Sequence, residues 1–230
     1  MSRPAMAFEA NPVLFGHGEK PGLLAVELTD DRHIRLYHQD GWEDVPFSPY
    51  LWLISPDLLQ GTKVPHRLEE LSGTSAYRVL AWFDSWADLN AARRHISKVV
   101  KAQGLKGETN LFLNDPVQQY LTLSGQTLFK GLRFGDLRRL QLHLEIDCGE
   151  ADFSHDQPHR ASLALGQDVF ELTPETEREE LERVAQRIRE VDPDVIEGHD
   201  LFRQHLPYLQ ERARRLGMKL AWGRDGRPAT

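Results

Sequence analysis

An eight-residue stretch near the middle of the chain combines strand periodicity with side chains that could hold a metal ion. In residues 140–147 four aliphatic side chains alternate with four polar ones. A period of two is typical of a strand with one buried face. The polar face includes the acid-x-acid pair Glu145 and Asp147, and hard divalent cations require several carboxylate oxygens close together. A half-exposed strand whose polar face meets water explains the same pattern.

A second group of polar residues follows a short apolar run. Residues 195–196 indicate a short buried strand, and His199 and Asp200 come soon after it. Asp200 could join Glu145 and Asp147 around one metal ion. Imidazole groups also suit Zn²⁺ or Mn²⁺, and the histidines of the two groups are His143, His199 and His205.

The elements that must position these residues follow the order strand, strand, strand, helix, strand, helix. Strands are expected at residues 161–165 and 169–172, so that they form a meander with the metal-binding stretch. Thr173 is the expected N-cap of the next helix, with Pro174 at its first position, where a missing N–H costs nothing. Residues 192–194 end that helix.

A final helix is expected from about His205 to Gly217, followed by a basic and frayed tail. Cations near a helix C-terminus could contact phosphates, but they also suit the helix dipole and water. Both explanations apply to Arg212, Arg214, Arg215, Lys219, Arg224 and Arg227.

The first 135 residues predict a mixed α+β fold with mainly antiparallel strands. Residues 23–28 and 33–37 indicate a hairpin across a short polar turn. The other expected elements are strands at 50–54, 77–83 and 111–113, a helix that is capped by Asp84 or Ser85 and runs to about Gln103, and a helix from Pro116. Aromatic side chains could stack on bases, but at strand spacing we expect Trp42, Phe47, Tyr50, Trp52 and Trp82 to be mostly core residues.

The bulk composition narrows the class of protein. The net charge is −7 and 27% of the residues are charged, which argues against a protein that coats nucleic acid through overall positive charge. The single cysteine, Cys148, excludes an internal disulfide framework and suits a reducing cytoplasm. There is no apolar run of membrane-spanning length and no signal-peptide pattern. We expect a cytoplasmic protein without membrane contact.

Two segments of the second half carry the motifs of a known family. Residues 192–217, DPDVIEGHDLFRQHLPYLQERARRLG, and residues 138–147, RRLQLHLEID, resemble the second and first exonuclease motif regions of family-B DNA polymerases of bacterial type. The resemblance implies an α/β RNase H-like (DnaQ-like) 3′–5′ exonuclease domain over residues 136–230, truncated at its C-terminal side. Less specifically, residues 1–135 resemble the α+β N-terminal domain of that family, through PFSPYLWL (46–53), the strand and helix at 77–101, and LFLNDPVQQYLTLSGQTLFKG (111–131).

The motif residues depart from the family pattern. The family binds two Mg²⁺ ions through an Asp and a Glu of the first motif and an Asp of the second, which also supplies an Asn and a Phe. Glu145 matches the Glu, but His143 and His205 stand where the two Asp residues are expected, and Asp200 and Gln204 replace the Asn and the Phe. Mg²⁺ binds oxygen rather than imidazole, and two-metal hydrolysis needs bridging ligands. The resemblance therefore implies a degenerate exonuclease site.

We therefore expect a polymerase fragment with a DNA-binding and structural role in replication or repair, without retained exonuclease activity and without a cofactor. The alternative is a nuclease with rearranged ligands that uses Mg²⁺ or Mn²⁺, and whether this chain alone is an enzyme stays open. The expected partners are single-stranded primer or template DNA, and a polymerase domain in the same or a partner chain.

Overall fold

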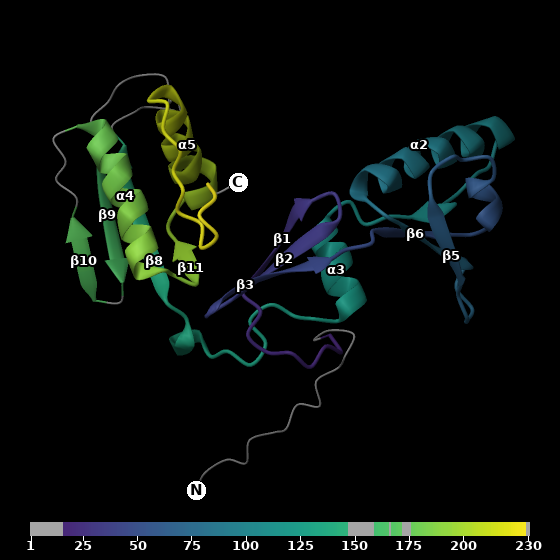
Figure 1. Cartoon of the computed structure of the whole chain (residues 1–230), viewed down its shortest axis with the longest axis horizontal. Helices are drawn as coiled ribbons and strands as arrows, with labels where there is room; N and C mark the ends of the chain where they lie inside the picture. Colours follow the sequence, from purple (N-terminus) through teal and green to yellow (C-terminus); the bar gives the residue numbers. More distant parts are fainter. Residues whose placement is uncertain (1–15, 147–158, 166, 172–175, 229–230) are drawn as a thin grey trace, which may run out of the picture. The chain divides into compact units, whose positions relative to one another are not determined.

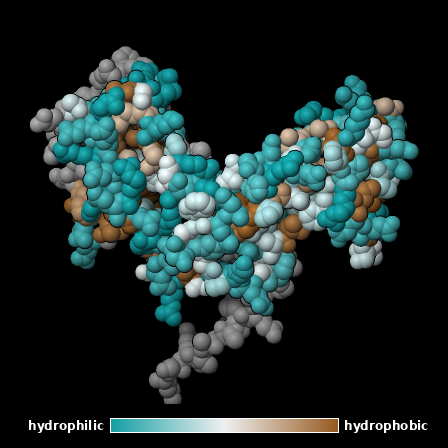
Figure 2. All heavy atoms as spheres, in the orientation of Figure 1, coloured by the Kyte–Doolittle hydropathy of each residue, from teal (hydrophilic) through white to brown (hydrophobic). Residues whose placement is uncertain are grey.

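The chain forms two compact units, Met1–Gly131 and Leu132–Thr230. A computed structural model describes residues 16–146, 159–165, 167–171 and 176–228 (Figure 1). In the view of Figure 2, hydrophilic side chains cover most of the visible surface of both units. Within the described ranges, no helix is both long enough and apolar enough to cross a lipid bilayer.

The first unit begins with a three-stranded antiparallel sheet in the order β1-β2-β3. Its strands are β1 (Ala25–Asp30), β2 (His33–His38) and β3 (Gly41–Pro46), and helix α3 (Pro116–Ser124) contacts β1. The predicted hairpin is confirmed as β1 and β2. Sequence reasoning missed β3, because its central residues are polar and exposed and show no buried face.

A second sheet of this unit has the order β5-β6-β4-β7. It consists of β4 (Tyr50–Leu53), β5 (His66–Glu70), β6 (Val79–Phe83) and β7 (Asn110–Leu111), with the 3₁₀ turn η1 (Pro56–Leu59) after β4. Edge strand β5 was not predicted, since all five of its residues are exposed and they do not alternate.

Helix α2 (Trp86–Gln103) covers one face of this second sheet. The Ser85 hydroxyl accepts a hydrogen bond from the Asp88 N–H, and Gly104 ends the helix in the left-handed conformation with φ 64°. The core between helix and sheet includes Leu51, Leu53, Val79, Phe83, Leu89, Ala92 and Ile96. Local capping signals and one apolar stripe therefore explain both the bounds and the packing of α2.

The aromatic residues of the first unit divide between core and surface. Phe47 and Tyr50 are buried, as expected. Trp42 is 45% exposed, and the guanidinium carbon of Arg35 lies 3.7 Å from its ring centroid. The expectation of a core position was therefore wrong for Trp42. Asp44, the next residue on the same face of β3, is also exposed.

The second unit is built on a four-stranded sheet in the order β10-β9-β8-β11. Strands β8 (Arg139–Ile146), β9 (His159–Leu165) and β10 (Asp168–Glu171) are antiparallel, whereas β11 (Val195–Glu197) is parallel to β8. Helix α4 (Glu177–Val191) connects β10 to β11, and the turn η2 (Phe134–Asp136) precedes the sheet. After β11 come the π-helical turn η3 (Leu201–His205) and helix α5 (Leu206–Arg215).

The cap of α4 differs from the prediction. Thr176 is the N-cap, because its hydroxyl accepts a hydrogen bond from the Glu179 N–H at 3.2 Å. Two threonines three residues apart both have suitable chemistry. Thr173 and Pro174 lie outside the described residues.

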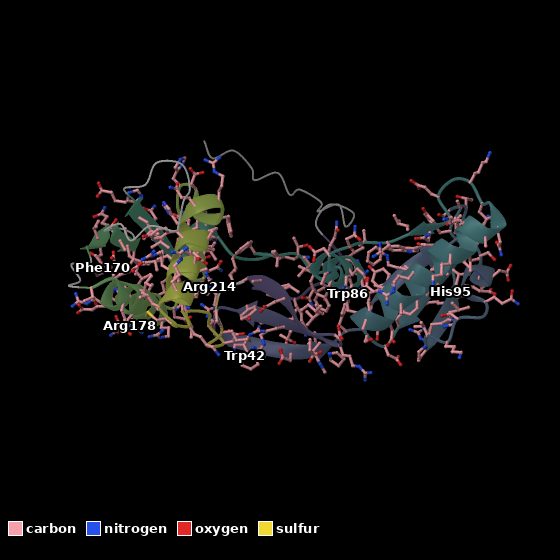
Figure 3. The ribbon with its side chains drawn as sticks, turned by 90° about the horizontal axis from the view of Figure 1, so that it is seen from above. Trp42, Trp86, His95, Phe170, Arg178 and Arg214 are labelled. Atoms are coloured by element: carbon pink, nitrogen blue, oxygen red, sulfur yellow. The ribbon has the colours of Figure 1, made fainter. Side chains whose placement is uncertain are left out.

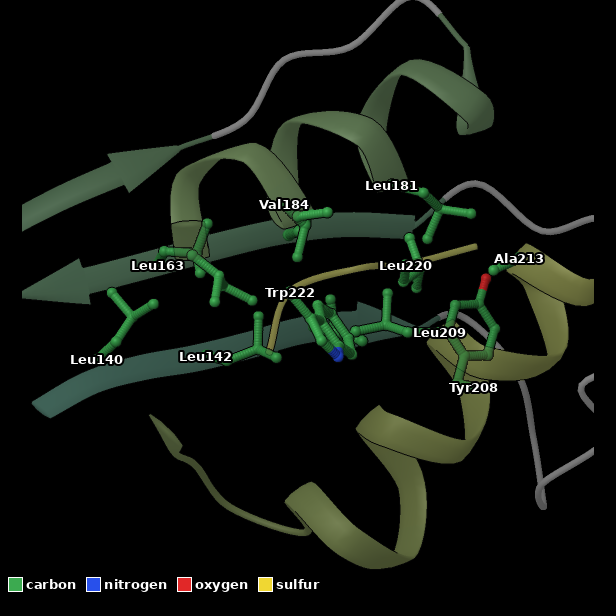
Figure 4. Packing of buried hydrophobic residues seen from close by; sticks show 14 of the residues in the cluster. Leu140, Leu142, Leu163, Leu181, Val184, Tyr208, Leu209, Ala213, Leu220 and Trp222 are labelled. Atoms are coloured by element: carbon green, nitrogen blue, oxygen red, sulfur yellow. The ribbon is translucent and has the colours of Figure 1, made fainter. Parts of the chain in front are cut away.

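The core of the second unit lies between the sheet and its helices (Figure 4). Inward-facing residues of β8 pack with the apolar stripe of α4 and with α5. The C-terminal segment also enters this core, since Leu220 and Trp222 are 5% and 6% exposed. The expectation of a frayed tail was therefore wrong for this part, because two large apolar side chains anchor it. The members shown are Leu140, Leu142, Leu163, Leu181, Val184, Tyr208, Leu209, Ala213, Leu220 and Trp222.

Candidate functional site

Parallel pairing brings the two predicted motif segments together. Glu197 at the end of β11 is in register with Gln141 on β8, so the chain after β11 continues beside the polar end of β8. A Cβ atom at Gly198 would lie 2.4 Å from the Leu142 carbonyl oxygen. Glycine is required there, because any side chain would push the turn away from the strand.

The turn η3 orients the second motif. Asp200 has a positive φ of 52° and precedes the turn. Its carbonyl oxygen accepts hydrogen bonds from the N–H groups of Gln204 at 2.8 Å and His205 at 3.3 Å. π-Helical turns are rare in proteins, and those that occur are often found at functional sites. It places His205 in the interior of the unit while its neighbours Phe202 and Arg203 remain exposed.

His205 is a buried imidazole with one hydrogen-bonded nitrogen. Its side chain donates to the Leu142 carbonyl, and the residue is only 4% exposed. Its Nδ1 atom is buried without a hydrogen-bond partner among the described residues. Burial lowers the pKa of His205, the nearby His143 lowers it further, and Asp200 opposes both effects. These causes favour a neutral imidazole at position 205.

His143 meets His205 edge to face. The two ring centroids are 5.8 Å apart and the ring planes make an angle of 77°. His143 and Glu145 are both exposed on the polar side of β8. We call His143, Glu145, His199, Asp200 and His205 the two-motif site. The structure thus brings together the two positions at which histidine replaces an expected carboxylate.

Asp200, the carboxylate of the second motif, lies beside the Arg203 guanidinium and the His199 imidazole. Its Oδ2 atom lies 3.2 Å from an Arg203 guanidinium nitrogen and 3.5 Å from His199 Nε2. Sequence reasoning missed Arg203, although its spacing of three residues from Asp200 on a helical turn was a usable signal. A guanidinium beside the carboxylate competes electrostatically with a bound divalent cation.

The predicted metal trio cannot be assembled from the described part of the chain. Asp147 lies outside the described residues, so its place relative to Glu145 and Asp200 is not defined. Among residues 16–146, 159–165, 167–171 and 176–228, no group of three or more His, Cys, Asp or Glu side chains is arranged to hold a metal ion.

The arginines of the predicted basic end all form ion pairs with carboxylates. Arg212 is 2% exposed and its guanidinium donates to Glu177, with one Nη2–Oε2 distance of 2.6 Å. Arg212 therefore belongs to the interior and is not part of a phosphate-binding surface. Arg214 and Arg215 both pair with Glu211 at 2.7 and 2.8 Å. The hydrogen bond from Arg214, and then that from Arg215, lowers the Glu211 pKa to about 2.

The remaining cations of this region have different environments. Lys219 is exposed. Arg224 pairs with Asp192 at 2.7 Å and with Asp194 at 3.0 Å, and Arg227 pairs with Asp225 at 2.5 Å. Arg214 and Arg178 of this unit are labelled in Figure 3. The phosphate-binding hypothesis therefore rests on the exposed residues Arg214, Arg215 and Lys219.

Part of the chain is similar in sequence to DNA polymerases. No family model matches the chain. It is 40% identical over 57 residues to DNA polymerase 2 of Aeropyrum pernix, 51% identical over 51 residues to a DNA polymerase of Pyrococcus glycovorans, and 47% identical over 55 residues to the DNA polymerase delta catalytic subunit of Arabidopsis thaliana. These matches span 22–25% of this chain and only 5–7% of the length of the relatives.

The fold supports the same relationship. The structure of the family B DNA polymerase from Pyrobaculum calidifontis matches 91% of this chain and 34% of its own length, with a TM-score of 0.58 and 16% identity. The named relatives come from archaea and a plant, and the bacterial subtype stays a prediction. The local sequence matches and the shared fold together relate this chain to the family B DNA polymerases.

Proposed function

We propose that this chain corresponds to the N-terminal and exonuclease-like region of a family-B DNA polymerase. In this proposal, residues 136–230 form part of an RNase H-like domain and residues 1–135 form the N-terminal domain. The strand order β10-β9-β8-β11, with β11 parallel to β8 and α4 between β10 and β11, supports the assignment. Sequence similarity to polymerases over about fifty residues supports it independently.

The proposed role is DNA binding and structural support, with 3′–5′ exonuclease activity lost. The single observation that carries the loss is the contact between His143 and His205, whose ring centroids are 5.8 Å apart. Two-metal hydrolysis of a phosphodiester needs anionic oxygens that bridge ions about 3.5–4 Å apart. Imidazole groups supply neither the negative charge nor the oxygens that Mg²⁺ prefers.

A metal-dependent nuclease with rearranged ligands is the second candidate. The unpartnered Nδ1 atom of His205 beside His143 favours it, because imidazole nitrogens bind Zn²⁺ or Mn²⁺. Glu145 and Asp200 would then supply oxygen ligands. Against it, the Nδ1 atom is enclosed and Asp200 faces Arg203. We therefore favour the inactive site.

The proposed partners are single-stranded primer or template DNA and a polymerase domain, which would lie in the same polypeptide or in a partner chain. The exposed cations Arg214, Arg215 and Lys219 are the proposed contacts of the second unit with phosphates. We propose a cytoplasmic location, in keeping with the single Cys148.

A nuclease assay tests the proposal. The purified chain would be incubated with a 5′-labelled single-stranded oligonucleotide and either Mg²⁺, Mn²⁺ or Zn²⁺. We expect no 3′ shortening beyond that of a buffer control. Shortening that is lost in Glu145→Gln and retained in Glu182→Gln would contradict the inactive site and favour the rearranged nuclease. Glu182 is a matched control, because it is an exposed carboxylate on α4.

A further inference from the structure

A row of cations occupies one face of helix α2 in the first unit. Arg94, Lys98 and Lys101 are all exposed, and their spacing of four and three residues places them on adjacent turns of one helix face. The buried residues Leu89 and Ile96 lie on the opposite side of the helix. We call the three cations the basic α2 face.

Many arginines of this chain form ion pairs with carboxylates, and the cations of the basic α2 face differ from them. Within the described residues, the basic α2 face forms no ion pair and no side-chain hydrogen bond. Helix α4 is the contrast, because Arg178 pairs with Glu182 and Arg183 with Glu179. The acidic residue Asp88 of α2 lies in the first turn, where it bonds to Ser85. The three positive charges therefore reinforce each other in a chain whose net charge is −7.

Caps at both ends and side-chain contacts hold helix α2 in place. Ser85 and Gly104 cap its ends. The His95 ring, labelled in Figure 3, contacts the Gln60 carbonyl oxygen at 3.1 Å. Arg93 lies with its guanidinium carbon 3.5 Å from the Phe112 ring centroid, so its cation is directed toward the core side rather than along the row. A rigid helix holds the spacing of the three exposed cations.

We propose that the basic α2 face binds the phosphate backbone of nucleic acid. Seven residues of α-helix rise about 10 Å, and one DNA strand carries a charge about every 3.4 Å of duplex axis. The row is therefore long enough for each of its three cations to approach a phosphate of the same strand segment. Such contacts position the strand without reading its bases. This site belongs to the first unit, whereas the cations of the α5 end belong to the second.

The inference deepens the proposed DNA-binding function and rests on it. The test is a salt titration of binding to a fluorescent single-stranded oligonucleotide, with Arg94→Gln, Lys98→Gln and Lys101→Gln combined in one variant. Glutamine keeps helix propensity close to that of lysine and arginine. Because each phosphate contact on a single strand contributes about 0.7 to the slope of log affinity against log salt, the variant should lose roughly 2 from that slope. Affinity near 0.1 M salt should fall tenfold to a hundredfold.

The control is the combined variant Arg67→Gln, Arg178→Gln and Arg183→Gln. It removes the same charge from three exposed arginines that have carboxylate partners, and its slope should stay close to that of the wild type. Circular dichroism and thermal unfolding check that both variants fold.

The possible outcomes distinguish a failure of the α2 site from a failure of the proposed function. A wild-type chain that binds no DNA at low salt contradicts both. Wild-type binding with an unchanged slope in the α2 variant overturns the α2 site and leaves the proposed function standing. Loss of binding to phosphatidylserine vesicles in the α2 variant, with DNA binding intact, would overturn the nucleic-acid assignment.

Discussion

At the scale of single residues, two histidines meet at the centre of the two-motif site. His205 is buried and donates to a backbone carbonyl, and its ring meets that of His143 in a T-shaped contact. A carboxylate at either position would be an oxygen ligand for a hard cation, whereas an imidazole has no oxygen to offer. His205 therefore connects η3 to β8 through its ring contact and its hydrogen bond.

The lowered pKa of His205 predicts a pH-dependent stability. Unfolding returns this pKa toward the ordinary value of about 6.5, so the unfolded chain binds the proton more tightly than the folded chain. The free energy of unfolding should be largest above pH 6.5 and should fall as the pH decreases through that value and through the lower folded pKa. Urea unfolding of the second unit between pH 5 and pH 8 measures this effect.

Two variants test whether His205 causes this pH dependence of stability. In His205→Gln the loss of stability between pH 7 and pH 5 should be smaller than in the wild type. His199→Gln is the control, because the His199 side chain is 94% exposed, and it should keep the wild-type dependence. Equal pH profiles in His205→Gln and the wild type would show that His205 is not the group responsible.

At the scale of elements, ion pairs connect helices that sequence periodicity treats as independent. Arg212 of α5 is buried and bonds to Glu177 in the first turn of α4. The periodicity of α5 predicted its apolar stripe, but an arginine at its C-terminal end reads as a solvated cation. Its partner lies 35 residues away, so only the packing of α4 against α5 could reveal the pair.

Removing the carboxylate of this pair should destabilise the second unit. Glu177→Gln removes a counter-charge that lies beside the buried guanidinium of Arg212, and we expect a loss of about 3–5 kcal/mol in the free energy of unfolding. The double variant Glu177→Leu, Arg212→Leu should recover most of the loss, since no buried charge remains. Chemical denaturation measures both.

The matched control for this pair is Glu182→Gln. Glu182 lies 4.0 Å from Arg178, and both side chains are more than half exposed, so its loss should change stability by less than about 1 kcal/mol. A cost for Glu177→Gln no larger than this control would contradict a stabilising buried pair.

At the scale of the whole molecule, the chain has separate cores in its two units. The core of Leu140, Leu181 and Leu209 belongs to the second unit, whereas that of Leu51, Phe83 and Leu89 belongs to the first. The sheets β10-β9-β8-β11 and β5-β6-β4-β7 each bury an apolar face against helices of their own unit. Separate cores favour separate unfolding transitions.

A core substitution in one unit tests this separation. Leu209 is fully buried, and Leu209→Ala should lower the free energy of unfolding of the second unit by about 2–5 kcal/mol. The transition of the first unit should keep its midpoint, and Leu89→Ala should give the converse result. Hydrogen exchange followed by mass spectrometry reports on each unit. Equal destabilisation of both units by Leu209→Ala would contradict the separation.

The sequence by itself determined the local structure and the chemistry of the motifs. Strict alternation in residues 140–147 predicted β8, because this signal acts over a few residues. Gly104 predicted the C-terminal end of α2, and the N-cap was narrowed to Asp84 or Ser85. The departures at His143 and His205 were visible as residue types. Their consequence for catalysis remains a proposal, which the nuclease assay tests.

Only the tertiary structure decided which charges are buried and which side chains meet. In the structure Arg212 and Trp222 are buried, whereas Trp42 is exposed. The tertiary structure also brought His205 to His143, and it added the polar strands β3 and β5, whose residues carry no buried face. These outcomes depend on contacts between segments far apart in the chain, and burial and pairing are properties of the packed elements rather than of any local pattern.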